Sequence, residues 1–471
     1  MVFSSIPFLF FLLPISLVLY YAVPYSVKNY ILLAFSLLFY AWGEPVYITL
    51  MLFETLSDYT LGRVMDGSDS SVVRRVCLIL SIVIDLSVLG FFKYADFLIG
   101  ILNNCFRMSI SPIGLGLPIG ISFFTFQTMS YTIDLYRKEV KVEKNYLYYL
   151  TYVSMFPQLI AGPIVRFSTV NEEIHNRKID MDGFVQGLLR FLIGLSKKVL
   201  IANLVGALWE TIKVSTSLSV AAAWLGAVCF TLQLYFDFSA YSDMAIGLGR
   251  MLGFHYLENF NYPLASVSVT DFWRRWHISL GSWFRDYVYI PLGGNRVSVL
   301  CHLRNMFIVW FLTGLWHGAA WNFIFWGVYY GILLSLEKYV YGKALKQLPV
   351  LIQHIYALFI VVFGFVIFVF DDLGELGRYC RILFGLGGCP LFDSEVLWYF
   401  SNYGILLTIA VLTAFPVYPV LSRWIGTIAG KGRIQRSVAA VFCSLLYIGA
   451  FILCTAYLVN DTYNPFLYFR F

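Results

Sequence analysis

Apolar runs long enough to cross a lipid bilayer recur along almost the whole chain. A spanning helix needs about 20 apolar residues, and about eleven to thirteen runs approach that length. Residues 113–133 are ambiguous between a span and a re-entrant segment, because Pro and Gly punctuate their start. Hydrophobic residues make up 59% of the chain and charged residues 13%, so too little polar surface exists to cover a water-soluble core. The sequence predicts an all-α, polytopic integral membrane protein.

The distribution of charged residues indicates which loops face the cytoplasm, and it gives no sign of a polyanionic partner. A net charge of +6 over 471 residues gives no case for nucleic-acid binding. The loop 423–436 is basic and is predicted to be cytoplasmic, whereas the acidic loop 371–395 and the tail 460–471 are predicted to lie outside. No repeat or hydrophilic linker interrupts the chain, so residues 1–471 are predicted to form a single domain.

The eight cysteines and six histidines show no spacing typical of a metal site, and none is predicted. Cys380 and Cys389 share the loop that is predicted to lie outside, where a disulfide can persist. Their spacing alone leaves open whether they form a disulfide.

The segment 270–289 carries Arg residues and aromatic residues together, which is unusual for a spanning helix. Thr270 is a predicted N-cap and Pro291 a predicted stop, so the pattern predicts one amphipathic helix lying in the membrane interface. His277 falls on its apolar face, while Arg274 and Arg275 fall elsewhere. A hydrogen-bonded structural histidine and a functional one both fit that placement.

The run from Asn305 to Leu336 contains no charged residue and a single imidazole, His317. As one helix it would be about 48 Å long, which exceeds a hydrocarbon core of about 30 Å. A break is therefore predicted beside Gly314 and Gly318. A neutral imidazole at that depth suits a general base, and an interhelical hydrogen bond is the alternative.

Gln233, Asp237 and Tyr241 recur at every fourth position of another apolar run. They are predicted either to line a buried polar channel or to pair with an Arg of the amphipathic segment. The sequence contains no P-loop, GxGxxG, GxSxG or HExxH motif. This argues against nucleotide binding, against a hydrolase with a nucleophile elbow and against a zinc protease.

Two strings then suggest a family. Residues 273–280 (WRRWHISL) are followed by residues 314–319 (GLWHGA), which place His317 forty positions after His277. Together they resemble the membrane-bound O-acyltransferase (MBOAT) family, and within it the alginate O-acetyltransferase (AlgI-like) branch. Further segments agree in order and spacing: 1–5 (MVFSS), 117–123 (LPIGISF), 159–163 (LIAGP), 235–249 (YFDFSAYSDMAIGLG) and 291–296 (PLGGNR).

The resemblance implies a fold of tilted and re-entrant helices around a central tunnel, with His317 as the catalytic residue and His277 in support. It implies acetyl-coenzyme A as the acyl donor, with no permanently bound cofactor. It also implies a multi-pass protein of the bacterial inner membrane, working on an exported polysaccharide through an extracytoplasmic Ser-type acyltransferase. Further residues are expected to line the tunnel or contact substrate: Trp316, Asn322, Trp276, Arg274, Arg275, Asp237, Tyr241 and Gln233.

The end of the chain is almost wholly aromatic and follows an F-x-Y-x-x-F pattern. This pattern resembles the tail of a small membrane protein that works with the teichoic-acid D-alanyl exporter. The hypothesis is that Phe466 and Phe471 anchor the tail in the outer mouth while Tyr468 accepts the acetyl group. An aromatic belt at the membrane interface is the alternative.

Other functions remain as alternatives. Peptidoglycan O-acetylation and acyl transfer to a lipid or protein would use the same histidine. A transporter would use buried His and Asp as an ion path. The absence of two related halves in the sequence argues against a transporter.

Overall fold

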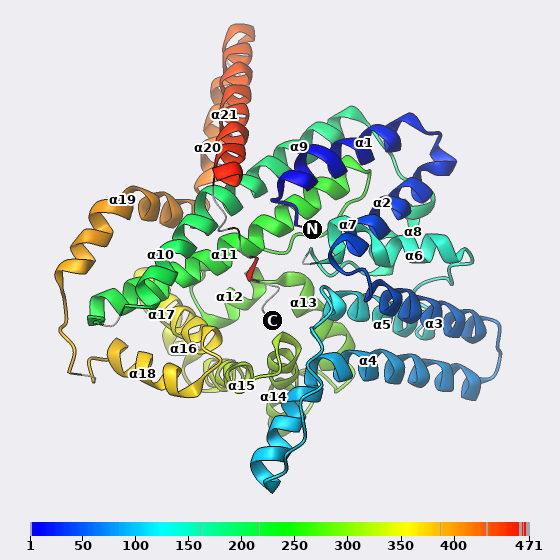
Figure 1. Ribbon diagram of the computed structural model, residues 1–471, viewed down its shortest axis with the longest axis horizontal. Helices are drawn as coiled ribbons and strands as arrows, with labels where there is room; N and C mark the ends of the chain where they lie inside the picture. Colours follow the sequence, from blue (N-terminus) through cyan, green and yellow to red (C-terminus); the bar gives the residue numbers. More distant parts are fainter. Residues whose placement is uncertain are drawn as a thin grey trace. The chain divides into compact units, whose positions relative to one another are not determined.

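The computed structural model describes residues 2–160, 162–215, 217–386, 388–429, 432–460, 464, 466 and 467 (Figure 1). Helices form the regular structure, and none of these residues belongs to a strand, which confirms the all-α prediction. Seven of the described helices are long and apolar enough to cross a membrane, which confirms a multi-pass membrane protein. The remaining apolar runs form shorter or more polar helices, so fewer helices qualify than the runs counted in the sequence.

The described chain divides into two compact units. Unit 1 comprises residues 1–191 and 242–258, and unit 2 comprises residues 192–241 and 259–471. The prediction of a single domain stays a prediction, because two compact units can belong to one domain.

Unit 1 is built from the N-terminal helices. They are η1 (Phe8–Leu12), α1 (Leu13–Ala22), η2 (Tyr25–Val27), α2 (Lys28–Gly43), α3 (Ile48–Asp66), α4 (Ser71–Phe106), α5 (Ile121–Tyr136), α6 (Tyr146–Ser154), α7 (Phe156–Leu159) and α8 (Phe167–His175). Helices α9 (Met181–Ser196) and α11 (Val220–Met251) contribute residues to both units.

Helices α3, α4 and α5 lie side by side and enclose carboxyl groups that the sequence analysis did not single out (Figure 1). Glu54, Asp58 and Asp85 are fully buried. Hydroxyl groups of α4 and α5 donate hydrogen bonds to these carboxyls, with distances of 3.1 Å from Thr125 to Glu54 and 2.7 Å from Ser81 to Asp58. Buried carboxyls keep such partners because an unsatisfied polar group is costly inside a protein.

Unit 2 contains the remaining helices. They are η3 (Lys197–Ala202), α10 (Asn203–Lys213), η4 (Pro263–Ala265), α12 (Val269–Arg275), α13 (Ile278–Phe284), η5 (Arg285–Tyr289), α14 (Val299–His317), α15 (Trp321–Leu336), η6 (Glu337–Tyr341), α16 (Gly342–Leu345), α17 (Val350–Val369), α18 (Leu373–Leu383), α19 (Ser394–Ala414), α20 (Val417–Ala429) and α21 (Arg433–Asn460).

The charge-free run folds as a helical hairpin. Helix α14 ends at His317, and α15 starts at Trp321, so the predicted break beside Gly318 is confirmed. The helices pack closely because a Cβ on Gly314 would overlap the carbonyl oxygen of Phe323. The hydroxyl of Tyr339, just beyond α15, lies 2.8 Å from Nδ1 of His302 near the start of α14. The two open ends of the hairpin therefore meet, and His317 lies at its turn.

The prediction of one helix over 270–289 is wrong. Helix α12 begins after Ser268, whose hydroxyl accepts a hydrogen bond from the Asp271 amide, so Thr270 is not the N-cap. The helix stops before His277, and α13 starts after it. The segment 259–261 causes the break, because its backbone bonds to the amide of Ile278 and to the carbonyl of Arg275.

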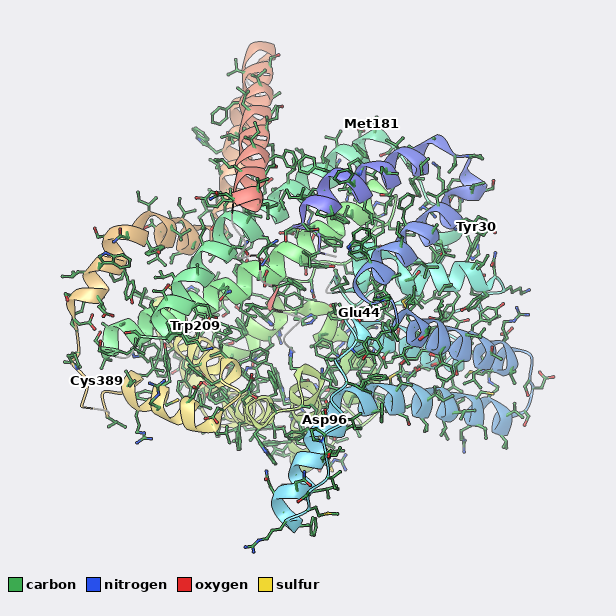
Figure 2. The ribbon with its side chains drawn as sticks, viewed as in Figure 1. Tyr30, Glu44, Asp96, Met181, Trp209 and Cys389 are labelled. Carbon is green, nitrogen blue, oxygen red and sulfur yellow. The ribbon has the colours of Figure 1, made fainter. Side chains whose placement is uncertain are left out.

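Aromatic packing holds α10 inside unit 2. Trp209, labelled in Figure 2, lies with its ring centre 5.5 Å from that of Phe230 and 6.0 Å from that of Tyr379.

Cys389, also labelled in Figure 2, is a free thiol, and so is Cys380. The disulfide left open by the sequence is absent from the structure.

Candidate functional site

His317 lies at the turn of the α14–α15 hairpin, enclosed by aromatic rings. Its side chain is buried, and its ring centre lies 5.1 Å from those of Trp316 and Trp326 and 5.2 Å from that of Phe368. The Trp326 and Phe368 rings meet the imidazole edge-on, at 84° and 85°. Residues of α14, α15 and α17 thus surround the imidazole with apolar surface, and low polarity strengthens any hydrogen bond that it makes.

His277 occupies the break between α12 and α13 in a left-handed backbone conformation, with φ 46° and ψ 53°. Such a conformation is uncommon for a residue with a side chain, and it occurs often at functional sites. The ring is buried, 4.6 Å from the centre of Phe238 and 5.9 Å from that of Trp316. Trp316 therefore touches both histidines, and the structure brings the two predicted site residues together.

Hydrogen bonds from Asn259 hold the His277 segment. The Asn259 carbonyl accepts from the Ile278 amide at 2.9 Å, and its side-chain oxygen accepts from the Ser279 amide at 3.1 Å. Nδ1 of His277 lies 3.2 Å from the same side-chain oxygen. Burial lowers the pKa of His277 to about 3, so the ring is neutral near pH 7.

Trp276 and Asn322 join the same region. Trp276 is buried, and the ring of Phe260 packs against both Trp276 and His277. Asn322 is fully buried and donates a hydrogen bond to the carbonyl of Phe368, whose ring touches His317. These predicted lining residues therefore support the aromatic enclosure of the histidines.

The two arginines differ from each other. Arg275 forms an ion pair of 2.9 Å with Asp271 within α12, whereas Arg274 is exposed. Arg275 is thus already neutralised by a neighbour on its own helix. Arg274 is the better placed of the two to contact a phosphate outside the protein.

Gln233, Asp237 and Tyr241 are buried on α11, and two of them contact the end of the chain. Asp237 accepts a hydrogen bond of 2.9 Å from the amide of Leu467, and Tyr241 lies 4.8 Å from the Phe466 ring centre. The other Asp237 oxygen pairs with Lys198 at 2.7 Å. The predicted pairing of this group with an arginine of the amphipathic segment is therefore wrong for Asp237, whose cation is Lys198.

The described part of the tail thus lies inside unit 2. Phe466 is buried, as expected of an anchor, and Asn464 accepts a hydrogen bond from Asn203. Leu467 bonds to Asp237, and the next residue of α11, Phe238, packs against His277. Tyr468 and Phe471 lie outside the described residues.

Several residues of this region escaped the sequence reasoning. Lys198 carried a usable signal, because a charge inside an apolar helix usually has a functional or ion-pairing reason. Asn259 carried none, since it follows a polar stretch in which an amide is unremarkable. Trp326 and Phe368 are ordinary aromatic residues of apolar helices, and only the fold places them around His317.

Comparisons with known proteins indicate the family of the chain. Residues 121–373 match the model of the membrane-bound O-acyltransferase family. The chain is 38% identical to a protein of Pseudomonas putida named "Probable alginate O-acetylase AlgI", over the full length of both. It is 42% identical to the protein of that name from Pseudomonas aeruginosa, over 82% of this chain and 75% of the relative. A peptidoglycan O-acetyltransferase of Helicobacter pylori is 34% identical, over 82% and 80% respectively.

Proposed function

Because the chain belongs to the membrane-bound O-acyltransferase family, we propose that it moves an acetyl group across the membrane for O-acetylation of an exported polysaccharide. The proposed donor is a cytoplasmic thioester, acetyl-coenzyme A. The observation that carries the proposal is the full-length identity to a relative named as an alginate O-acetylase. The chain is an acyltransferase by family, and the two buried histidines of unit 2 are the groups on which this chemistry would depend.

In the proposed reaction, His317 acts as the general base. Its imidazole takes the proton of an acceptor hydroxyl while the oxygen attacks the thioester carbonyl. The carbon–sulfur bond then breaks, a carbon–oxygen bond remains, and the proton returns to the leaving thiolate. The rings of Trp316, Trp326 and Phe368 keep water from competing with the hydroxyl. His277 orients the reacting groups.

The proposed first acceptor is the phenol of Tyr468 on the tail. Support comes from the preceding residue, since the Leu467 amide bonds to Asp237 and the adjacent Phe238 packs on His277. The acetyl-tyrosine ester would then pass its acyl group to the serine of an extracytoplasmic acyltransferase, which acetylates the polysaccharide. This route uses the donor on one side of a bacterial inner membrane and the product on the other.

Three other functions compete with this one. Peptidoglycan O-acetylation has a specific observation in its favour, the 34% identity to a relative of that name. Acyl transfer to a lipid or protein would need the same histidines. A transporter is the weakest alternative, because the family is one of acyltransferases.

Deleting the gene is expected to remove O-acetyl groups from the exported polysaccharide, measured by proton NMR of the purified polymer. Wild-type protein should restore them, and the His317→Ala protein should not. If the polymer keeps its acetyl groups while muropeptides lose theirs, the acceptor is peptidoglycan. If neither polymer changes, the proposed function is wrong.

His277→Ala is expected to retain more activity than His317→Ala. A residue that orients substrate contributes less to the rate than the base that moves the proton. We therefore expect the rate to fall about tenfold in His277→Ala and about a thousandfold in His317→Ala. Release of coenzyme A from acetyl-coenzyme A by the reconstituted proteins measures both. The opposite order of residual activity would exchange the two roles.

A further inference from the structure

The side-chain oxygen of Asn259 collects hydrogen-bond donors from the break between α12 and α13. It accepts from the backbone amide of Ser279 at 3.1 Å and from the Ser279 hydroxyl at 2.9 Å. Nδ1 of His277 lies 3.2 Å away. Asn259 and His277 are both buried, so water does not compete for these bonds.

These contacts select one tautomer of the neutral His277 ring. A backbone amide can only donate, so the Asn259 atom that faces it is the amide oxygen rather than the nitrogen. An oxygen that faces Nδ1 at 3.2 Å requires a hydrogen on Nδ1, because two lone pairs would otherwise repel. The neutral ring therefore carries its proton on Nδ1 and a lone pair on Nε2. Nε2 is buried and has no hydrogen-bond partner among the described residues.

We infer that Asn259 is a positioning residue that makes His277 a hydrogen-bond acceptor toward substrate. Nε2 of His277 then accepts a hydrogen bond from the acceptor hydroxyl as it binds, before that hydroxyl turns its hydrogen to His317 for transfer, and Nε2 has no hydrogen to give to a thioester carbonyl. His277 thus recognises the acceptor of the acyl group rather than its donor. This inference rests on the proposed function, because it needs a hydroxyl that takes the acetyl group.

Asn259 makes the shortest polar contact of the His277 ring among the described residues, and aromatic rings make up most of the other contacts. The rings of Phe238 on α11, Phe260 and Trp316 on α14 face the imidazole, and none of them titrates. Ser279 on α13 has a hydroxyl 3.5 Å from Nδ1. Trp316 also packs against the ring of His317, with 5.1 Å between the ring centres. A charge placed at position 259 should therefore act directly on His277.

The test is Asn259→Asp in reconstituted protein supplied with acetyl-coenzyme A, assayed from pH 5 to pH 9. Aspartate keeps the oxygen that the Ser279 amide needs, but its negative charge raises the pKa of His277, by about one to three units for a close opposite charge. At low pH the ring becomes imidazolium and Nε2 can no longer accept a hydrogen bond. A rise of three units would bring that pKa to about 6, and the ratio of variant to wild-type rate is then expected to fall about tenfold from pH 8 to pH 5. Dividing by the wild-type rate cancels the pH effects that the two proteins share.

A ratio that rises toward low pH would overturn the inference, because an imidazolium that helps is acting as a donor. A ratio that does not change with pH would overturn it as well, since a purely structural asparagine predicts that result. Asn145→Asp is the matched control: Asn145 is the N-cap of α6 in unit 1, its side-chain oxygen accepts from the Leu147 amide as an aspartate oxygen also would, and its ratio should not change with pH. If wild-type protein releases no coenzyme A at any pH, the proposed function fails instead.

A second measurement does not depend on activity. Nitrogen-15 NMR of the histidine-labelled wild-type protein distinguishes Nδ1–H from Nε2–H, and His277→Gln identifies the signal. The Nδ1–H form is expected. The Nε2–H form would overturn the inference whatever the pH profiles show.

Discussion

The His317→Ala protein is expected to insert and fold normally and to transfer acetyl groups about a thousandfold more slowly than wild type. A positioned general base contributes about 10²–10⁴ to the rate, and the buried His317 side chain packs against the rings of Trp326 and Phe368, which limits its contact with bulk water. The measurement is release of coenzyme A by the reconstituted protein, normalised to the folded fraction from size-exclusion chromatography.

His317→Gln is the companion variant, because it keeps most of the buried volume and removes the basic ring. Both variants should be inactive if the role is chemical. His255→Ala is the control, since His255 is an exposed histidine of unit 1 paired with Glu173, and its removal should change the rate less than twofold. Wild-type turnover by either His317 variant would remove His317 from the mechanism.

Tyr468→Phe is expected to reduce acetylation of the exported partner to background, a loss of at least about a hundredfold. The substitution keeps the aromatic ring that a membrane-interface belt needs, and it removes the hydroxyl that would carry the acetyl group. The direct readout is a single turnover with radiolabelled acetyl-coenzyme A, followed by mass spectrometry of the C-terminal peptide. Wild-type protein should carry acetyl on Tyr468.

Tyr463→Phe provides the matched control, because it removes a hydroxyl from the same tail outside the F-x-Y-x-x-F pattern. The Tyr463→Phe protein should carry acetyl on Tyr468 to the same extent as wild type. If the Tyr468→Phe protein acetylates the extracytoplasmic acyltransferase as well as wild type does, Tyr468 is only an anchor of the tail. Asp237→Asn then separates docking from chemistry: it keeps an oxygen for the Leu467 amide but loses the charge that pairs with Lys198, so weaker acetyl-Tyr468 formation would point to the ion pair.

Local pattern sufficed where a feature depends on neighbouring residues. The composition required a membrane protein, since a chain with 59% hydrophobic residues has too little polar surface for water. The break after His317 followed from the excess length of the apolar run and the position of its glycines. His277 and His317 were found as polar residues in apolar surroundings, and their spacing within two motifs indicated the family that the comparisons confirmed.

The features that local pattern missed depend on contacts between distant residues. The segment 270–289 has a helical periodicity, yet its helix breaks at His277 because Asn259, eighteen positions earlier, bonds to the Ile278 and Ser279 amides. Helix periodicity describes bonds between residues four positions apart and contains no information about such a partner. A continuous helix was therefore the natural prediction.

The sequence alone determined the membrane setting, the two histidines and the family, because each is expressed in composition or in short motifs. The tertiary structure decided which groups surround them: Trp316 against both histidines, Lys198 beside Asp237, and Asn259 against Nδ1 of His277. It also decided that the described part of the tail lies in unit 2, where Leu467 bonds to a residue 230 positions away. The physical reason is that burial and hydrogen bonding are satisfied by whichever groups the packed helices bring within reach, and sequence distance does not limit that choice.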